Sequence, residues 1–314
     1  MNKIAKTALI TGTALCVAGV VLSTVGYFAG GKDFSYTSKH FYVSGGNSSE
    51  KDLDIMKKQQ IDDFSDLNVD FQDFDLDIRT SEDDHYYMEY RLEKIGGESP
   101  LTWGNKDGEL TMKESNGSTG GYFINYDLGF LKGEMEETEK QDILNTVILY
   151  VPEKAELSNA KLTFSNGDLT IEKLFCKNMT VKLDDGDLFA GELQADELQL
   201  KNSDGDVTLK KAALADGKIT LGDGDLEIDK SSFDGDMKIK NSNGDVSIGT
   251  DADSLEKTDI YLETSNGSID TGRISSGNSN SNSDDDTAVY ENKVNNADAS
   301  LEVSSSDGDI TLTE

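Results

Sequence analysis

Cysteine, proline and histidine are nearly absent from this 314-residue chain, which contains two of each. Cys16 lies in an apolar N-terminal run and Cys176 in a repetitive region, so we do not expect them to form a disulfide. This excludes the class of small disulfide-stapled domains. Cys176 is expected to be a small buried side chain rather than a reactive thiol.

Recognisable catalytic motifs are also missing. The chain has no phosphate-binding loop, zinc-ligand spacing or nucleophile elbow, and its histidines, His40 and His85, lie outside the repeats. Carboxylates are so numerous that a glycosidase-like pair would arise by chance. We therefore predict a protein that is not an enzyme and has no cofactor. A polysaccharide-processing β-helix enzyme is the least favoured alternative, because it rests on fold analogy alone.

Positive charge is scarce as well. The chain has 29 Lys and Arg against 61 Asp and Glu, for a net charge of −32. Nucleic-acid binding depends on neutralising phosphates with Lys and Arg, so we predict no nucleic-acid partner. The same reasoning disfavours polyanionic glycans and leaves cations, cationic peptides and basic protein surfaces open. Solubility of an exposed domain is the general explanation for such acidity.

The one long hydrophobic segment lies at the N-terminus. Lys3 and Lys6 precede an uncharged run over residues 7–29, which as a helix of about 23 residues would span about 34 Å. We predict a cytoplasmic stub and transmembrane helix over 1–31, with the bulk of the chain extracellular. The alternative, a cleaved signal peptide, has a shorter apolar centre and a clearer cleavage site. Residues 32–60 are expected to form a juxtamembrane spacer, with room for a short helix.

The richest feature of the sequence is a recurring Asn/Asp-Gly-Asp unit. It is clearest in Ser165-Asn166-Gly167-Asp168-Leu169-Thr170-Ile171, and from Gly167 to Gly244 it returns at intervals of 19, 19, 19 and 20 residues. Apolar residues two and four places after the glycine alternate with polar ones, as in a strand with one buried face. Glycine and Asn or Asp suit tight corners. The expected corner glycines are Gly167, Gly186, Gly205, Gly224, Gly244, Gly267 and Gly308.

Two architectures fit this repeat. A meander of hairpins would form an antiparallel sheet or barrel, whereas a solenoid would stack each unit on the last. We favour the solenoid, because the copies match position for position and one unit cannot bury its own apolar residues. The predicted fold class is therefore all-β, a β-helix or solenoid-like rod.

We place the repeat domain at 61–314, with insertions near 114–141 and 275–298. The first insertion carries an acidic, helix-like piece around residues 133–140, and 275–286 is expected to be a mobile loop. The Lys106-Asp107-Gly108-Glu109-Leu110 stretch resembles a degraded repeat corner.

Stacking would place the aspartates that follow the glycines in a row about 5 Å apart. In bulk water the repulsion would be about 0.8 kcal/mol per adjacent pair. Calcium could offset it, although the sequence lacks the tandem Gly-Gly-x-Gly-x-Asp pattern of calcium-binding β-rolls. Alternatively, each carboxylate accepts backbone N–H groups of its own turn and faces water. The candidate calcium ladder comprises Asp168, Asp187, Asp206, Asp225 and Asp245.

A strand ending in Val151-Pro152, followed by serial Asn/Asp-Gly-Asp units behind one N-terminal apolar segment, resembles the DUF4097 family. These are β-strand-repeat proteins of bacteria, labelled adhesins, and they include LiaG-like envelope proteins. The resemblance covers 61–314 and is strongest over 146–248. It implies a right-handed β-helix-like rod at the cell surface, with no established activity and no catalytic residues to carry over. The departures are the two insertions and Ser268, which stands where the repeat has aspartate.

These observations together predict a membrane-anchored extracellular module that is not catalytic. Its partners would be the membrane, through the N-terminal helix, and a protein or another component of the cell envelope. The alternative suggested by the resemblance is an accessory component of an envelope-stress signalling system that acts through protein contacts.

Overall fold

A computed structural model describes residues 34–36, 41–43, 53–95, 97–115, 124–126, 144–272, 278–281 and 287–313. The predicted transmembrane helix over 1–31 and the acidic piece around 133–140 lie outside these ranges. Within them, no helix has the length and apolar character needed to cross a bilayer. The chain divides into two units, one of Met1–Leu53 with Gly117–Asp142 and one of Asp54–Asn116 with Ile143–Glu314.

The first unit contains a small antiparallel sheet. Its central strand β1 (Phe34–Tyr36) pairs on one side with β2 (Phe41–Val43) and on the other with β9 (Ile124–Tyr126). The predicted spacer and the first insertion therefore meet in one sheet, although they are far apart in sequence. Residues 53–60 of the predicted spacer are not helical, because they belong to strand β3 (Leu53–Ile61), which from Asp54 onward lies in the second unit.

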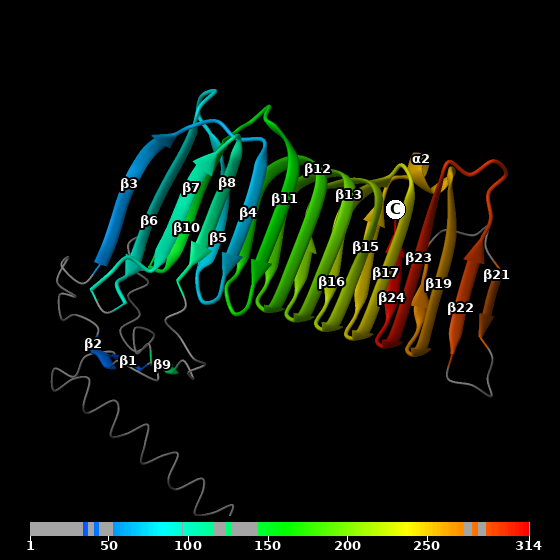
Figure 1. The fold of residues 1–314 in the computed structure, drawn as a ribbon. Helices are drawn as coiled ribbons and strands as arrows, with labels where there is room; N and C mark the ends of the chain where they lie inside the picture. The colour runs from blue at the N-terminus through cyan, green and yellow to red at the C-terminus, as the bar shows by residue number, and fades with distance from the viewer. Residues whose placement is uncertain are drawn as a thin grey trace, which may run out of the picture. The chain divides into compact units, whose positions relative to one another are not determined.

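The second unit confirms the all-β, solenoid-like prediction (Figure 1). Strand β12 (Leu169–Asp185) pairs in parallel with β13 (Leu188–Asp204) along its whole length, always with residues 19 apart. The same offset joins β13 to the strands that follow it, β14 (Val207–Leu209) and β15 (Ala212–Asp223). The next coil consists of β16 (Leu226–Phe233) and β17 (Asp236–Asn243), and β18 (Val246–Thr250) begins the coil after it, in parallel with β16.

The change of period from 19 to 20 has a definite place in the structure. Leu214 pairs with Phe233, an offset of 19, whereas Gly217 pairs with Met237, an offset of 20. The extra residue therefore falls in the turn at Asp234–Asp236, where it displaces no core position.

Each regular coil has two faces. The long face is formed by residues 178–185 and their equivalents, and the short face by residues 169–171 and theirs, with a connecting segment at 173–176. Along each face, alternate side chains point inward, and those of Leu169, Val207 and Leu226 are at most 1% exposed. Burying a Leu or Val side chain stabilises a fold by about 1.5–3 kcal/mol. One coil alone would leave these side chains exposed to water, so the core forms only when coils stack on both sides.

The chain is interleaved at the N-terminal end of this unit. Strand β4 (Asp66–Phe71) lies between β8 (Glu109–Glu114) and β11 (Glu156–Phe164), and β5 (Asp75–Ser81) lies between β10 (Thr146–Pro152) and the start of β12. Strand β6 (Tyr86–Glu93) pairs antiparallel with β10. The coil formed by β4 and β5 therefore pairs with strands that come much later in the chain.

The predicted degraded corner near Asp107 is wrong. Strands β7 (Leu101–Lys106) and β8 pair antiparallel, so Asp107 and Gly108 form the turn of a hairpin rather than a solenoid corner. Both have positive φ, 55° and 84°, as a two-residue hairpin turn requires.

The C-terminal end is interleaved in the same way. After the short helix α2 (Ala252–Leu255), β19 (Thr258–Asn266) and β20 (Ile269–Asp270) skip one position in the stack. Strand β23 (Ala299–Asp307) fills the place between β17 and β19, and β24 (Ile310–Thr313) fills that between β18 and β20. The last described strands therefore lie inside the stack and not at its end.

The second insertion covers the outer edge. Strand β22 (Ala288–Asn292) pairs antiparallel with β19, and β21 (Asn278–Ser281) pairs antiparallel with β22. The prediction of a loop throughout 275–286 is therefore wrong for residues 278–281. An added hairpin of this kind covers a strand edge that would otherwise be free to pair with another chain.

The seven corner glycines lie in one row. A Cβ atom on any of them would come within 2.0–2.4 Å of a backbone oxygen of the preceding corner, which is closer than real contacts allow. Gly205, Gly224, Gly244 and Gly308 also have φ between 124° and 144°, which favours glycine. The row begins against the carbonyl of Phe74 and runs through Gly167, Gly186, Gly205, Gly224, Gly244, Gly308 and Gly267.

Replacing one corner glycine should destabilise the stack. In Gly205→Ala the new methyl group would lie 2.3 Å from the Gly186 oxygen, at a φ of +144°, so we expect a loss of about 2 kcal/mol or more in urea unfolding. Gly104→Ala is the matched control, because no atom lies within 4 Å of its added Cβ. Equal effects of the two substitutions would contradict the close stacking.

Candidate functional site

The aspartates that follow the corner glycines form a continuous hydrogen-bonded ladder. The backbone N–H of Asp187 donates to Oδ1 of Asp168 at 2.8 Å, and that of Asp206 donates to Oδ1 of Asp187 at 2.8 Å. The pattern repeats from Asp225 to Asp206, from Asp245 to Asp225 and from Asp309 to Asp245, at 2.7–2.9 Å. Each carboxylate therefore accepts a backbone N–H of the next coil. The alternative drawn from the sequence, that it accepts N–H groups of its own turn, differs from this.

The two ends of the ladder explain two irregularities of the sequence. At one end, Asp75 accepts from the N–H of Asp168 at 2.9 Å, although no glycine precedes it. At the other end, Ser268 donates both its N–H and its hydroxyl to Asp309, at 2.7 and 3.0 Å. Gly267 ends the glycine row. No N–H of a following corner therefore needs an acceptor from Ser268, which can replace aspartate.

A second column, of the residues that precede the glycines, runs beside the ladder. Asn side chains in it donate to carboxylates of the neighbouring coil, as from Asn266 to Asp307 at 2.9 Å. Asp185, Asp204 and Asp223 are consecutive in the column and have no Asn between them. Loss of solvation, and next the neighbouring carboxylates, raise the pKa of Asp204.

The five candidate calcium ligands are brought into one row, but their Oδ1 atoms are already engaged by backbone N–H groups. In the ranges that the structure describes, no three His, Cys, Asp or Glu side chains are grouped so that they could hold a metal ion. These hydrogen bonds give each carboxylate a donor from the next coil, and calcium binding by the row stays a prediction.

Two residues of this system were missed by sequence reasoning. Asp75 lacks the glycine, yet Asp75-Leu76-Asp77-Ile78 repeats the spacing of Asp168-Leu169-Thr170-Ile171 and could have been found. Glu114 had no sequence signal. Its side chain is 4% exposed, and its Oε2 accepts the backbone N–H groups of Gln72, Asp73 and Phe74 at 2.6, 2.8 and 3.3 Å.

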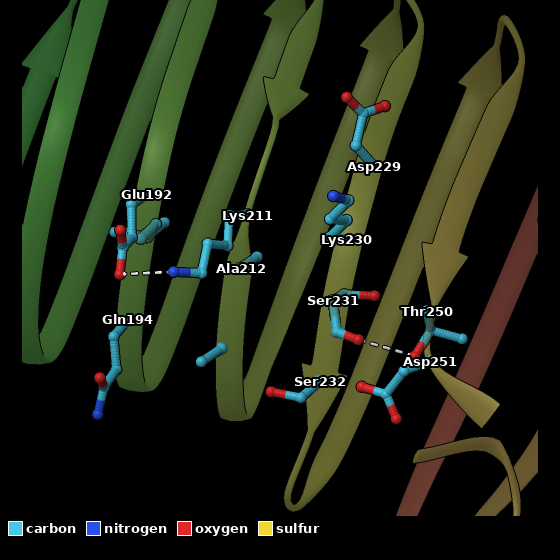
Figure 2. A pocket seen from close by; sticks show the side chains of 12 residues that line it. Glu192, Gln194, Lys211, Ala212, Asp229, Lys230, Ser231, Ser232, Thr250 and Asp251 are labelled. Carbon is cyan, nitrogen blue, oxygen red and sulfur yellow. Dashed lines mark hydrogen bonds and ion pairs between the residues drawn. The ribbon is translucent and has the colours of Figure 1, made fainter. Parts of the chain in front are cut away.

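A groove of about 520 Å³ opens over the connecting segments of β13, β15 and β16 (Figure 2). Its floor includes Ala213 and Ser232, which are smaller than Gln194 in the equivalent position of the preceding coil. Charged side chains surround this floor: Glu192, Lys211, Asp229, Lys230 and Asp251.

Several polar groups of the groove are paired with each other or with neighbouring residues. Lys211 Nζ lies 3.0 Å from Glu192 Oε1. The Ser231 hydroxyl donates to the carbonyl of Gly249 at 2.7 Å, and the Thr250 hydroxyl donates to the carbonyl of Ser231 at 2.8 Å. Both hydroxyls therefore donate to backbone carbonyls and not to a side chain that could act as a base.

Cys176 is buried, as predicted from the sequence. Burial is the main cause that raises the pKa of its thiol to about 11, so the thiolate is not populated at neutral pH.

Comparison with known proteins decides the family. The model of the Toastrack DUF4097 family matches residues 64–313. The chain belongs to this family. The Toastrack match starts at the coil formed by β4 and β5 and ends at β24, so it includes both interleaved ends. No functionally curated protein matches the chain.

Several solved structures are similar to this chain at low sequence identity. A proposed cell adhesion protein from Clostridium sporogenes is 13% identical, with a TM-score of 0.31, over 83% of this chain and 98% of its own. A proposed adhesin from Bacteroides fragilis is 12% identical, with a TM-score of 0.39, over 84% and 98%. A proposed lipid-binding protein from Parabacteroides distasonis is 12% identical, with a TM-score of 0.37, over 86% and 98%.

Removing one carboxylate from the ladder should expose its role. Asp206→Ala leaves the N–H of Asp225 without its acceptor, and we expect a loss of about 1 kcal/mol in urea unfolding. Asp206→Asn keeps an oxygen in the same place and should lose less. If the Asn variant is as destabilised as the Ala variant, the carboxylate acts through its charge and not as an N–H acceptor.

Glu114 should make stability depend on pH. Burial raises its pKa above the ordinary 4.5, so its contribution is complete below pH 4.5 and declines as the pH rises through the raised value. Glu114→Gln cannot titrate, so the stability advantage of the wild type over this variant should shrink between about pH 4 and pH 7. Chemical denaturation at several pH values measures it, and an advantage that grows with pH would contradict the assignment.

Proposed function

We propose that this protein is a non-catalytic binding module of the bacterial cell surface. The N-terminal apolar segment anchors it in the membrane with its N-terminus in the cytoplasm, and the Toastrack unit, wound as a right-handed coil, lies outside. There it binds a protein or another component of the envelope, in the manner of an adhesin.

One observation supports this proposal most strongly. The residues that hold the solenoid together point inward or line the corner row. The outward side chains of both faces are therefore not needed for the fold. On the short face, for example, Thr170 and Phe189 are exposed while Leu169 and Ile171 are buried. A rigid scaffold with free outward side chains is typical of repeat proteins that bind extended partners.

The groove over the connecting segments offers a second contact surface. Small side chains in two successive coils, Ala213 and Ser232, create it, and mixed charges border it. Its hydroxyls are bonded to backbone carbonyls, which supports a binding role over a catalytic one.

Cysteine labelling of the full-length chain tests both location and binding. We would introduce Thr170→Cys on the short face or Ser232→Cys in the groove, and treat intact cells with a membrane-impermeant, photoactivatable maleimide. The wild type is the matched control for the two native cysteines, which are Cys16 in the proposed membrane anchor and the buried Cys176, whose thiol has a pKa of about 11 and should stay unlabelled. We expect labelling of both variants on intact cells and cross-links to an envelope component. Labelling only after lysis would contradict the location, and labelling without cross-links would contradict the binding role.

A further inference from the structure

The long face of the solenoid carries a concentration of positive charge that the sequence does not reveal. Two outward rows cross the adjacent strands β11, β12, β13, β15 and β17. One row consists of Lys161, Thr180, Gln199, Lys218 and Lys238, and the other of Thr163, Lys182, Lys201, Thr220 and Lys240. Six of these ten positions are lysine and none is a carboxylate, in a chain whose net charge is −32. We call the two rows the lysine track.

Most lysines of the track are available to a partner. Lys182 pairs with Asp184 at 2.9 Å, and Lys238 pairs with Glu302. The other four are exposed and have no ion pair with any residue that the structure describes. They are Lys161, Lys201, Lys218 and Lys240.

Carboxylates border the track on both sides. Along one border, next to the connecting segments, lie Glu197 and Asp216, in register with each other, and then Asp236. Along the other border run Asp184 and the corner column of Asp185, Asp204 and Asp223. The track is thus a narrow positive strip between two negative edges.

The length and width of the strip fit a narrow, linear partner. Five strands about 4.8 Å apart give a length of about 19 Å, and two outward rows are about 7 Å apart along a strand. A broad anionic membrane surface would bring the bordering carboxylates against its own charges, whereas a linear polyanion would contact only the lysines. Single-stranded nucleic acids are bound with the help of stacking aromatic residues, and the track contains none.

We propose that the lysine track binds a linear, non-nucleic polymer with regularly spaced phosphate groups, lying across the strands. Each phosphate would pair with exposed ammonium groups on neighbouring coils. The carboxylates along both borders would repel the polymer and so confine it to the track. This differs from the expectation drawn from net charge, which disfavours polyanionic ligands. The proposal rests on the proposed binding role and names the class of partner.

The test uses the purified full-length chain in detergent and fluorescent linear inorganic polyphosphate as the probe. The track variant is Lys161→Gln, Lys201→Gln, Lys218→Gln and Lys240→Gln together. The control variant, with the same net charge, is Lys57→Gln, Lys106→Gln, Lys177→Gln and Lys257→Gln, all exposed positions outside the track. We expect about a tenfold or greater loss of affinity in the track variant and less than about a twofold change in the control. Binding by the wild type should weaken as salt is added.

Three outcomes would overturn the proposal: no binding of polyphosphate by the wild type, equal losses in the two variants, or equally tight binding of vesicles that contain anionic phospholipid. Melting curves of both variants confirm that each is folded, because these lysines point outward from the core. If polyphosphate does not bind but the short-face or groove cysteines still cross-link to an envelope component, only the track proposal fails and the binding role stands.

Discussion

The close approach of successive backbones at the corners is the constraint on which the rest of this structure depends. No Cβ fits between a corner and the preceding carbonyl oxygen, which fixes glycine at seven positions. The following residue must place its N–H near the previous coil, and an aspartate carboxylate there accepts it. The two requirements together set the register of every strand that follows, and with it which side chains are buried and which face outward.

A stack of this kind must also protect its ends, since an unpaired coil exposes both backbone edges and core. The chain does so by interleaving. The β4–β5 coil is enclosed by strands that come later, and the β23–β24 pair lies between earlier coils. Glu114 satisfies the N–H groups of the turn at 72–74, Ser268 ends the aspartate ladder, and the β21–β22 hairpin covers the last edge. Both ends therefore depend on contacts between residues distant in sequence.

The periodic part of the fold could be predicted because each repeat contains its own signals. The Asn/Asp-Gly pair marks the corner, and the alternation of apolar residues marks the buried face. The order of coils at the ends could not, since alternation says which face of a strand is buried but not which strand lies beside it. Asp75 escaped notice because Phe74 precedes it in place of a glycine, and Glu114 because no local pattern marks it. The lysine track was hidden for a different reason. Net charge sums over the chain, whereas the register gathers Lys182, Lys201 and Lys240 onto one face.

Amide hydrogen exchange at the corners, followed by NMR, tests the central claim most directly. The side chains of Asp187, Asp206, Asp225 and Asp245 are exposed, so a simple surface turn would leave their backbone N–H groups to exchange rapidly. If each N–H is held by the carboxylate of the preceding coil, all four should exchange slowly, together with the core amides. Exchange at the rate of an unstructured peptide at these positions would contradict the ladder and the register that it sets.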